Sequence, residues 1–175
     1  MANNIIILGA GLSGLYLAWK LEQILPADSK LIILEARERI GGRILSPQWG
    51  KSAEGRVDLG PAWCWPQFQP RLARLINELQ CGAFKQFTRG KMLYESADGK
   101  LQQHGGPSSH DQSYRVVAGA IELINALQRQ LQRSEIHLHT EVNCIDLHSG
   151  KITANCTADN TKKTVTYAAD KIILA

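Results

Sequence analysis

The order of hydrophobic and polar positions in the first 35 residues predicts a strand, a helix and a second strand. In residues 4–8 a continuous apolar run follows Asn4 and is closed by glycine, which is typical of a strand buried on both faces. Apolar residues then recur at helical spacing over 12–25, where a proline ends the pattern. A second segment, 30–34, has an apolar run after Lys30 and ends at Glu35. The three segments together predict a βαβ unit with parallel strands and a right-handed crossover.

The middle of the chain is predicted to hold short elements joined by loops. Helical spacing covers 69–79 and 119–131. Short strands are predicted at 83–87, 91–95 and 135–139. The segment 101–113 is rich in Gly, Ser, His and Gln and carries little pattern, so we expect a loop there.

The last third of the chain is predicted to be all strand. Turn signals separate three candidates, 141–147, 151–156 and 164–167, which indicates an antiparallel meander. The run at 171–174 is typical of a core strand in a parallel sheet, which a helix normally follows, so we expect the chain to be part of a longer protein. The predicted fold is α/β: a Rossmann-like doubly wound parallel sheet with helices on both faces, and the antiparallel β-meander laid over one of them.

Composition and charge exclude several classes of partner. The 175 residues carry a formal net charge of +4, and their Lys and Arg residues are scattered, so we expect neither a nucleic-acid nor a membrane partner. The N-terminus lacks a basic region and an apolar stretch long enough to cross a bilayer, which predicts a cytoplasmic protein. The histidines show no metal-ligand spacing, and no metal site is predicted.

A glycine motif lies between the first predicted strand and helix. Gly9, Gly11 and Gly14 match G-x-G-x-x-G, in which the glycines allow a tight turn, a close approach to a pyrophosphate and close helix–strand packing. The diphosphate would lie at the helix N-terminus, where free N–H groups favour negative charge. Glu35, at the end of the second strand, could bind ribose hydroxyls and would repel a 2′-phosphate. The pattern predicts a dinucleotide site for FAD or NAD, and argues against NADP.

The residues after Glu35 favour FAD. The run E-A-R-E-R-I-G-G-R at 35–43 resembles the E-A-x-x-R-x-G-G-R signature of FAD-dependent amine oxidases, which include monoamine, polyamine and L-amino-acid oxidases. Gly41 and Gly42 would let the loop approach the cofactor, and Arg43 would neutralise phosphate charge. The resemblance implies FAD as the cofactor.

Three later segments extend the resemblance over nearly the whole chain. The run 57–63 resembles the family's V-D-x-G-x-x-W/Y segment, which passes close to the flavin ring, and Asp58 in it is interpreted as a loop-fixing acceptor rather than a general base. The run 115–120 lies where the family has R-x-x-G-G-M, but Ala118 replaces one glycine, and its side chain would hinder a close approach of the cofactor or of other backbone there. Thr140-Glu141-Val142 resembles a short t-x-V segment whose valine backbone pairs with adenine.

The motifs and the resemblance together imply a set of cofactor-binding residues. They are Gly9, Gly11, Leu12, Ser13, Gly14, Glu35, Ala36, Arg37, Gly41, Gly42, Arg43, Gly60, Pro61, Ala62, Trp63 and Val142. Trp63 could instead be an ordinary core or surface aromatic. In the family, the aromatic cage around the amine and the lysine near the flavin lie mostly in the C-terminal half, so no catalytic residue is assigned in this chain.

The resemblance also implies an organisation and an activity. Residues 1–175 would be the N-terminal portion of an FAD-binding domain, with 64–115 as a candidate start of the substrate domain and the C-terminal half of the same protein as partner. The complete protein would oxidise the C–N bond of a small amine to an imine, with oxygen reoxidising the flavin to give hydrogen peroxide, and this portion alone would be inactive. Two alternatives stay open: another flavin-dependent dehydrogenase or desaturase of the same fold, and a non-catalytic FAD-binding subunit that needs a partner chain.

Overall fold

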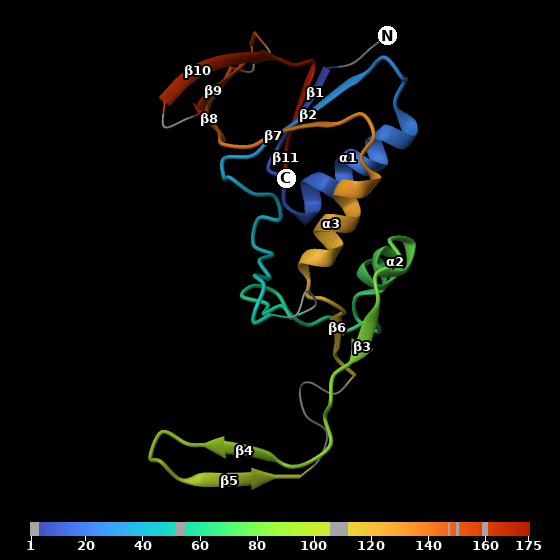
Figure 1. Ribbon diagram of the computed structural model, residues 1–175, viewed down its shortest axis with the longest axis vertical. Helices are drawn as coiled ribbons and strands as arrows, with labels where there is room; N and C mark the ends of the chain where they lie inside the picture. Colours follow the sequence, from blue (N-terminus) through green and yellow to red (C-terminus); the bar gives the residue numbers. More distant parts are fainter. Residues whose placement is uncertain (1–3, 52–54, 106–111, 147, 150, 159–160) are drawn as a thin grey trace.

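The centre of the fold is a parallel sheet of four strands (Figure 1). A computed structural model describes residues 4–51, 55–105, 112–146, 148–149, 151–158 and 161–175. The sheet has the order β11-β1-β2-β7. Its strands are β1 (Asn4–Leu8), β2 (Lys30–Leu34), β7 (Glu135–His137) and β11 (Lys171–Leu174). The predicted bounds of the first two strands and the parallel direction of β1, β2 and β11 are confirmed. Strand β7, predicted over 135–139, also runs parallel and ends at His137.

The two faces of this sheet are covered by different kinds of element. Ile7 and Ile33 point to one face and are fully buried in the larger core beneath α1 (Leu12–Ile24) and α3 (Ile121–Gln130). Ile6 and Leu34 point to the other face and pack in a smaller core with Ile152 of the meander. Side chains alternate along each strand, so one continuous apolar run serves both cores.

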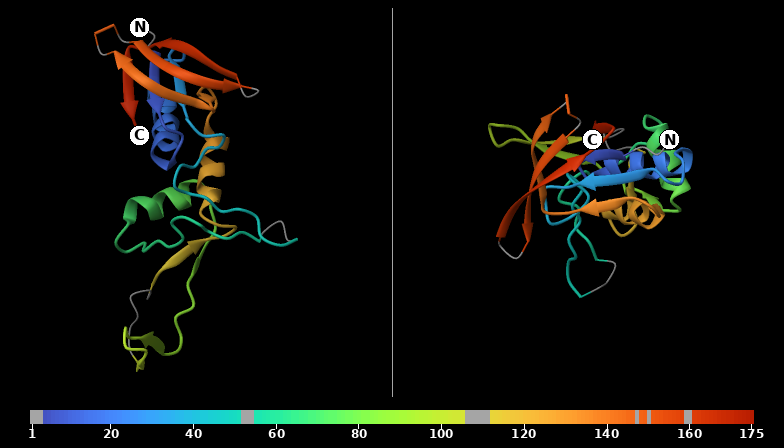
Figure 2. Two further views of the ribbon diagram at one scale, coloured as in Figure 1. Left: turned by 90° about the vertical axis from the view of Figure 1, so that its left-hand side faces the viewer. Right: turned by 90° about the horizontal axis from the view of Figure 1, so that it is seen from above.

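The expectation of helices on both faces is not met within the described residues. The face opposite α1 and α3 carries the antiparallel meander, with order β10-β9-β8 (Figure 2). Its strands are β8 (Thr140–Asp146), β9 (Lys151–Ala158) and β10 (Thr161–Ala168). The predicted meander is therefore confirmed, with a bulge between Val142 and Cys144 that the sequence pattern did not indicate.

One carboxylate joins α1 to the end of α3. Glu22 accepts hydrogen bonds from the backbone N–H groups of Gln132, Arg133 and Ser134 at 2.7–3.1 Å. The Ser134 hydroxyl donates to the same carboxylate at 2.6 Å. Burial alone would raise the pKa of Glu22, but these hydrogen bonds outweigh it and lower the pKa. The contact links residues more than 100 positions apart, and it lies at the end of α1 away from the glycine turn.

The remaining elements extend away from the sheet, below α3 in Figure 1. They are α2 (Pro70–Glu78), β3 (Ala83–Lys85), β4 (Met92–Glu95), β5 (Leu101–His104) and β6 (Tyr114–Val116). Strands β3 and β6 pair with each other, and β4 pairs with β5 in a projecting hairpin.

The loop predicted for 101–113 is wrong at its first residues. Leu101–His104 is β5, which pairs antiparallel with β4. Every residue of the two strands is exposed, so no buried face imposes an apolar alternation on the sequence. Residues 106–111 lie outside the described residues. Among the helices that the structure describes, none is both long enough and apolar enough to cross a membrane.

Candidate functional site

The carboxyl ends of β1 and β2 open into a cleft of about 570 Å³. Ligands of open α/β sheets bind at this edge, and the volume is typical of small-molecule and cofactor sites. Segments far apart in the sequence form its wall. The lining residues are Gly9, Gly11, Leu12, Ser13, Glu35, Arg37, Gly41, Gly42, Arg43, Ile44, Pro61 and Ala175.

The glycine turn between β1 and α1 needs two of its glycines for steric reasons. Gly9 has a φ of +107°, a conformation that L side chains rarely adopt. A Cβ on Gly14 would lie 2.0 Å from the carbonyl oxygen of Gly9, so only glycine lets α1 start so close to the end of β1. The Gly9 N–H donates to the carbonyl of Leu34 at 2.8 Å, which fixes the turn against β2.

The N-terminus of α1 faces the cleft with free donors. Gly11 is the N-cap residue, no side chain caps the helix, and its first turn contains no acidic residue. Gly11, Leu12 and Ser13 all line the cleft. The first backbone N–H groups of a helix have no intrahelical acceptor and carry the positive end of its dipole, so an anion is favoured there.

Glu35 lies at the floor of the cleft and organises the backbone around it. One carboxylate oxygen accepts the N–H of Ala10 at 2.9 Å, and the other accepts the N–H of Arg37 at 3.0 Å. The residue is only 6 % exposed, yet it lines the cleft. A carboxylate has about four acceptor positions, so two backbone donors leave it able to accept hydroxyl groups from a ligand.

The two arginines nearest the paired glycines lie in different environments. Arg39 donates to the carbonyl oxygens of Ile40, Gly42 and Ile44 at 3.0–3.2 Å, so its guanidinium holds the loop together. Arg43 is exposed and lines the cleft. The first arginine is therefore structural, and the second presents its charge to a ligand.

The loop 59–63 forms the far wall of the cleft. Leu59 donates its N–H to the carbonyl of Leu45 at 2.9 Å, and a Cβ on Gly60 would lie 2.2 Å from the carbonyl oxygen of Arg43. Backbone therefore packs directly on backbone at this point. Pro61 lines the cleft, whereas Ala62 and Trp63 line a neighbouring apolar cavity of about 90 Å³.

A buried carboxylate anchors the start of this loop. The Asp58 side chain, 2 % exposed, accepts hydrogen bonds from the Ser46 hydroxyl at 2.5 Å, the Arg115 guanidinium at 2.8 Å and the Ala120 N–H at 2.9 Å. Burial alone would raise the pKa of Asp58, but these hydrogen bonds and the positive charge of Arg115 outweigh it and lower the pKa. The Ser46 hydroxyl also accepts the N–H of Ile121, at the first turn of α3. The structure agrees with the interpretation of Asp58 as a loop-fixing acceptor.

The structure brings ten of the sixteen predicted cofactor-binding residues to the cleft wall. The other six lie elsewhere. Gly14 and Gly60 pack against backbone, and Ala62 and Trp63 line the smaller cavity. Ala36 is exposed beyond the end of β2, and Val142 packs in the core beneath the meander. The prediction that the backbone of Val142 pairs with adenine stays a prediction.

Three residues of the site were not predicted: Ile44 and Ala175, which line the cleft, and Ser46. Ile44 lines the cleft and is 6 % exposed, and Ser46 caps α3 together with Asp58. Both follow the paired glycines in a segment without a regular pattern. Ala118, which stands where the resembling family has glycine, has a φ of +61° and therefore keeps the left-handed conformation that glycine would adopt.

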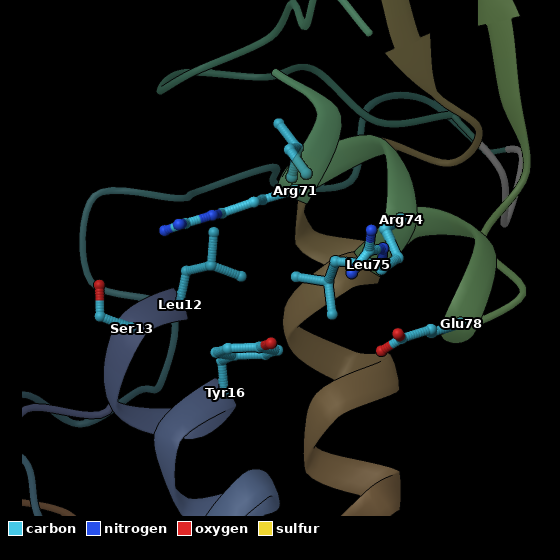
Figure 3. Close-up of a pocket in the computed structure, with 8 residues that line it drawn as sticks. Leu12, Ser13, Tyr16, Arg71, Arg74, Leu75 and Glu78 are labelled. Atoms are coloured by element: carbon cyan, nitrogen blue, oxygen red, sulfur yellow. The ribbon is translucent and has the colours of Figure 1, made fainter.

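A second cleft, of about 470 Å³, lies between α1 and α2 (Figure 3). Leu12, Leu72 and Leu75 supply its apolar lining. Figure 3 shows Tyr16 projecting from α1 toward this space. Its charged rim comes from α2 and consists of Arg71, Arg74 and Glu78. Leu12 and Ser13 line both clefts, so the first turn of α1 separates them.

Comparison with known proteins identifies a dinucleotide-binding fold and a group of relatives. Residues 7–79 match the family model of the NAD(P)-binding Rossmann-like domain. The chain is 30% identical to putrescine oxidase of Kocuria rosea over 104 residues, covering 59% of the chain and 20% of that protein. It is 27% identical to the probable flavin-containing monoamine oxidase A of Dictyostelium discoideum over 140 residues, covering 79% of the chain and 29% of that protein.

A solved structure supports the fold. Wild-type putrescine oxidase bound to putrescine superposes with a TM-score of 0.72 at 17% identity, covering 99% of this chain and 58% of that one. At this identity the likeness shows the fold alone. The chain thus spans less than a third of the two relatives it matches in sequence and little more than half of the solved chain.

Proposed function

We propose that this chain, a relative of the flavin-containing amine oxidases that corresponds to their N-terminal part, holds FAD in an enzyme that oxidises an amine. One observation supports FAD as the cofactor. The uncapped N-terminus of α1, the Glu35 carboxylate and Arg43 all face one cleft at the carboxyl edge of the sheet. That set pairs donors for a diphosphate with an acceptor for ribose hydroxyls.

The residues present fit FAD at both charged and uncharged parts of the cleft. The N–H groups of the first turn of α1 would hold the diphosphate, and Arg43 would neutralise its charge. Glu35 would accept the adenosine ribose hydroxyls, while its two backbone bonds keep the carboxylate oriented. The backbones of Gly11 and Gly42 lie so close together that a Cβ on Gly42 would be 3.3 Å from the Cα of Gly11. Because neither residue has a side chain, a ligand in the cleft could lie directly against the main chain.

The matched domain model does not separate FAD from a nicotinamide cofactor, since both use this turn. The flavin-containing relatives and the E-A-x-x-R-x-G-G-R run at 35–43 favour FAD. When bound, FAD would supply the redox chemistry: it would accept a hydride from the carbon that bears nitrogen while the nitrogen loses a proton, and oxygen would then accept the two electrons and two protons to give hydrogen peroxide. The resulting imine would be hydrolysed by water.

We also propose that residues 64–115 begin the substrate-binding part of the complete protein. These residues contain α2 and the strands β3, β4 and β5, which lie away from the parallel sheet in Figure 1. Large apolar side chains in them are exposed, among them Phe87 at 81% and Leu101 at 73%. The C-terminal part of the same protein would cover these side chains and supply the catalytic residues.

An absorbance spectrum of the complete purified protein tests the proposal. Oxidised flavin would give two bands, in the near ultraviolet and the blue, and both should bleach when an amine is added without oxygen. The panel should include a diamine, an aromatic monoamine and an L-amino acid. Admission of air should restore the bands and release hydrogen peroxide in an amount equal to the amine consumed.

Other outcomes would redirect or remove the proposal. Bands that no amine bleaches, but that a hydrophobic polyene or a porphyrinogen does, would identify a different flavin-dependent dehydrogenase. Bands that respond to no donor until a second chain is added would identify a cofactor-binding subunit. A protein that neither contains FAD nor takes it up would contradict the proposal.

A further inference from the structure

We infer that Asp58 and Arg115 are positioning residues, which hold the cleft-lining loop 59–63 in place for the flavin end of the cofactor. The inference rests on the proposed function, because the flavin is expected beside this loop. Asp58 is not among the described residues that line the cleft. Its role would be exerted through the backbone of the loop that it starts.

Two neighbouring residues of β6 fix the two ends of this loop. Arg115 pairs with Asp58 at 2.8 Å, immediately before the loop. Tyr114 exchanges two backbone hydrogen bonds with Cys64, immediately after the loop, at 2.7 and 2.9 Å. Only five residues separate Asp58 from Cys64, so both ends of a short segment are held on consecutive positions of one strand. A displacement of β6 would therefore move the cleft wall with it.

The same carboxylate ties the loop to α3 and to the segment after the paired glycines. One oxygen of Asp58 accepts from Ser46 and from the N–H of Ala120, and the other accepts from Arg115. Ser46 follows the cleft residues Arg43 and Ile44 by two or three positions. Asp58 thus connects three segments: the loop 59–63, the segment that follows Gly41 and Gly42, and the start of α3.

The geometry makes the carboxylate difficult to replace. An asparagine in the same position offers one acceptor oxygen, and its amide nitrogen would meet a second donor. If the oxygen keeps Ser46 and Ala120, the nitrogen faces the Arg115 guanidinium, donor against donor. The Arg115 charge would then lose its partner at a site where the carboxylate is 2 % exposed. We expect the loop to separate from β6 in Asp58→Asn.

The test separates the flavin end of the cleft from its nucleotide end. The complete protein is stripped of cofactor, and the dissociation constants of FAD and ADP are measured by calorimetry for the wild type, Asp58→Asn, Arg115→Gln and Arg115→Lys. ADP has the diphosphate but lacks the flavin, so it should contact the glycine turn, Glu35 and Arg43 but not the loop 59–63. We expect Asp58→Asn and Arg115→Gln to raise the dissociation constant of FAD at least tenfold and that of ADP less than twofold. Arg115→Lys keeps the charge and should recover part of the loss.

Glu22→Gln is the matched control. Glu22 is also a carboxylate that accepts several backbone donors and a serine hydroxyl, but it lies at the end of α1 away from the cleft. The Glu22→Gln variant should have a lower melting temperature but unchanged dissociation constants for FAD and ADP. Ser46→Ala, which removes one donor to Asp58, is a milder variant to use if Asp58→Asn fails to fold.

The outcomes distinguish the inference from the proposed function. If the wild type binds FAD, and Asp58→Asn or Ser46→Ala binds it as tightly as the wild type, the inference is wrong and the proposed function stands. Equal loss of FAD and ADP would also overturn it, because that pattern indicates general loosening of the fold. A wild type that binds ADP but not FAD would overturn the proposed function and the inference together.

Discussion

Glu35 and Ala10 are joined by a hydrogen bond of 2.9 Å from the Ala10 N–H to a carboxylate oxygen at the end of the neighbouring strand. The other oxygen accepts the N–H of Arg37. Glu35, which the sequence motif predicts to bind a ribose, therefore also stabilises the protein's own backbone. It clamps the glycine turn between the ends of β1 and β2.

Replacing Glu35 should therefore affect both stability and binding. In Glu35→Gln the side-chain amide can accept only one of the two backbone N–H groups and would present a donor to the other. We expect a loss of about 1–3 kcal/mol in the free energy of unfolding, measured in urea. Glu38→Gln, an exposed position in the same loop, is the control and should change little. Equal stability of the two variants would contradict the clamp.

Acid should remove the stabilisation that Asp58 provides. Its pKa is lowered in the folded protein because hydrogen bonds from Ser46, Arg115 and Ala120 outweigh the effect of burial. Its contribution is therefore complete above the ordinary aspartate pKa, about 3.9, and is lost as the pH falls through the lower folded value. Urea unfolding between pH 7 and pH 3 should show the difference between wild type and Asp58→Asn shrinking below about pH 4. A difference independent of pH would count against the ionised carboxylate.

Arg39 and Arg43 should respond to mutation in opposite ways. Arg39→Gln removes the donor fork from three carbonyl oxygens and should destabilise the fold by about 2 kcal/mol. Arg43→Gln removes an exposed charge and should leave the melting temperature nearly unchanged. Arg43→Gln should weaken FAD binding, most strongly at low salt, because the lost interaction is electrostatic. Thermal melts and FAD titrations at two salt concentrations measure both effects, and a salt-independent loss would argue against a phosphate contact.

Gly14 should tolerate no side chain. The Cβ of Gly14→Ala would lie 2.0 Å from the Gly9 carbonyl oxygen, so α1 must move away from β1. We expect a loss of about 1–3 kcal/mol in the free energy of unfolding. Gly105→Ala, whose Cβ would meet nothing within 4 Å, is the matched control. Chemical denaturation of both variants checks the prediction, and similar stabilities would refute the close contact.

The central sheet was predictable because burial on both faces leaves a strong signal. The strands 4–8 and 30–34 each consist of one polar residue followed by four apolar residues, and each strand ends where its apolar run ends. The hairpin strand β5 was missed because its sequence, L-Q-Q-H, is exposed throughout and follows no alternation. What covers the second face of the sheet was only partly predicted, since strand patterns indicate a meander but do not exclude a helix beside it.

The site was predictable where a local sequence motif fixes the backbone. The glycine turn and Glu35 meet in one cleft because strand, turn and strand follow each other within 35 residues. Contacts that depend on tertiary structure gave no such signal. Ser46 and Ala120 are 74 positions apart, and their common partner Asp58 becomes evident only when α3 is packed against the sheet.

The strand order of the sheet also governs how the protein can be assembled during synthesis. Strand β1 pairs with β2 at once, but its other edge waits for β11, about 140 residues after β2. At ordinary translation speeds this delay is on the order of ten seconds or more. Throughout that time the row of backbone groups on β1 is an open edge, able to pair with another chain. We therefore expect aggregation to compete with folding during this stage, and a chaperone that covers the open edge to favour folding.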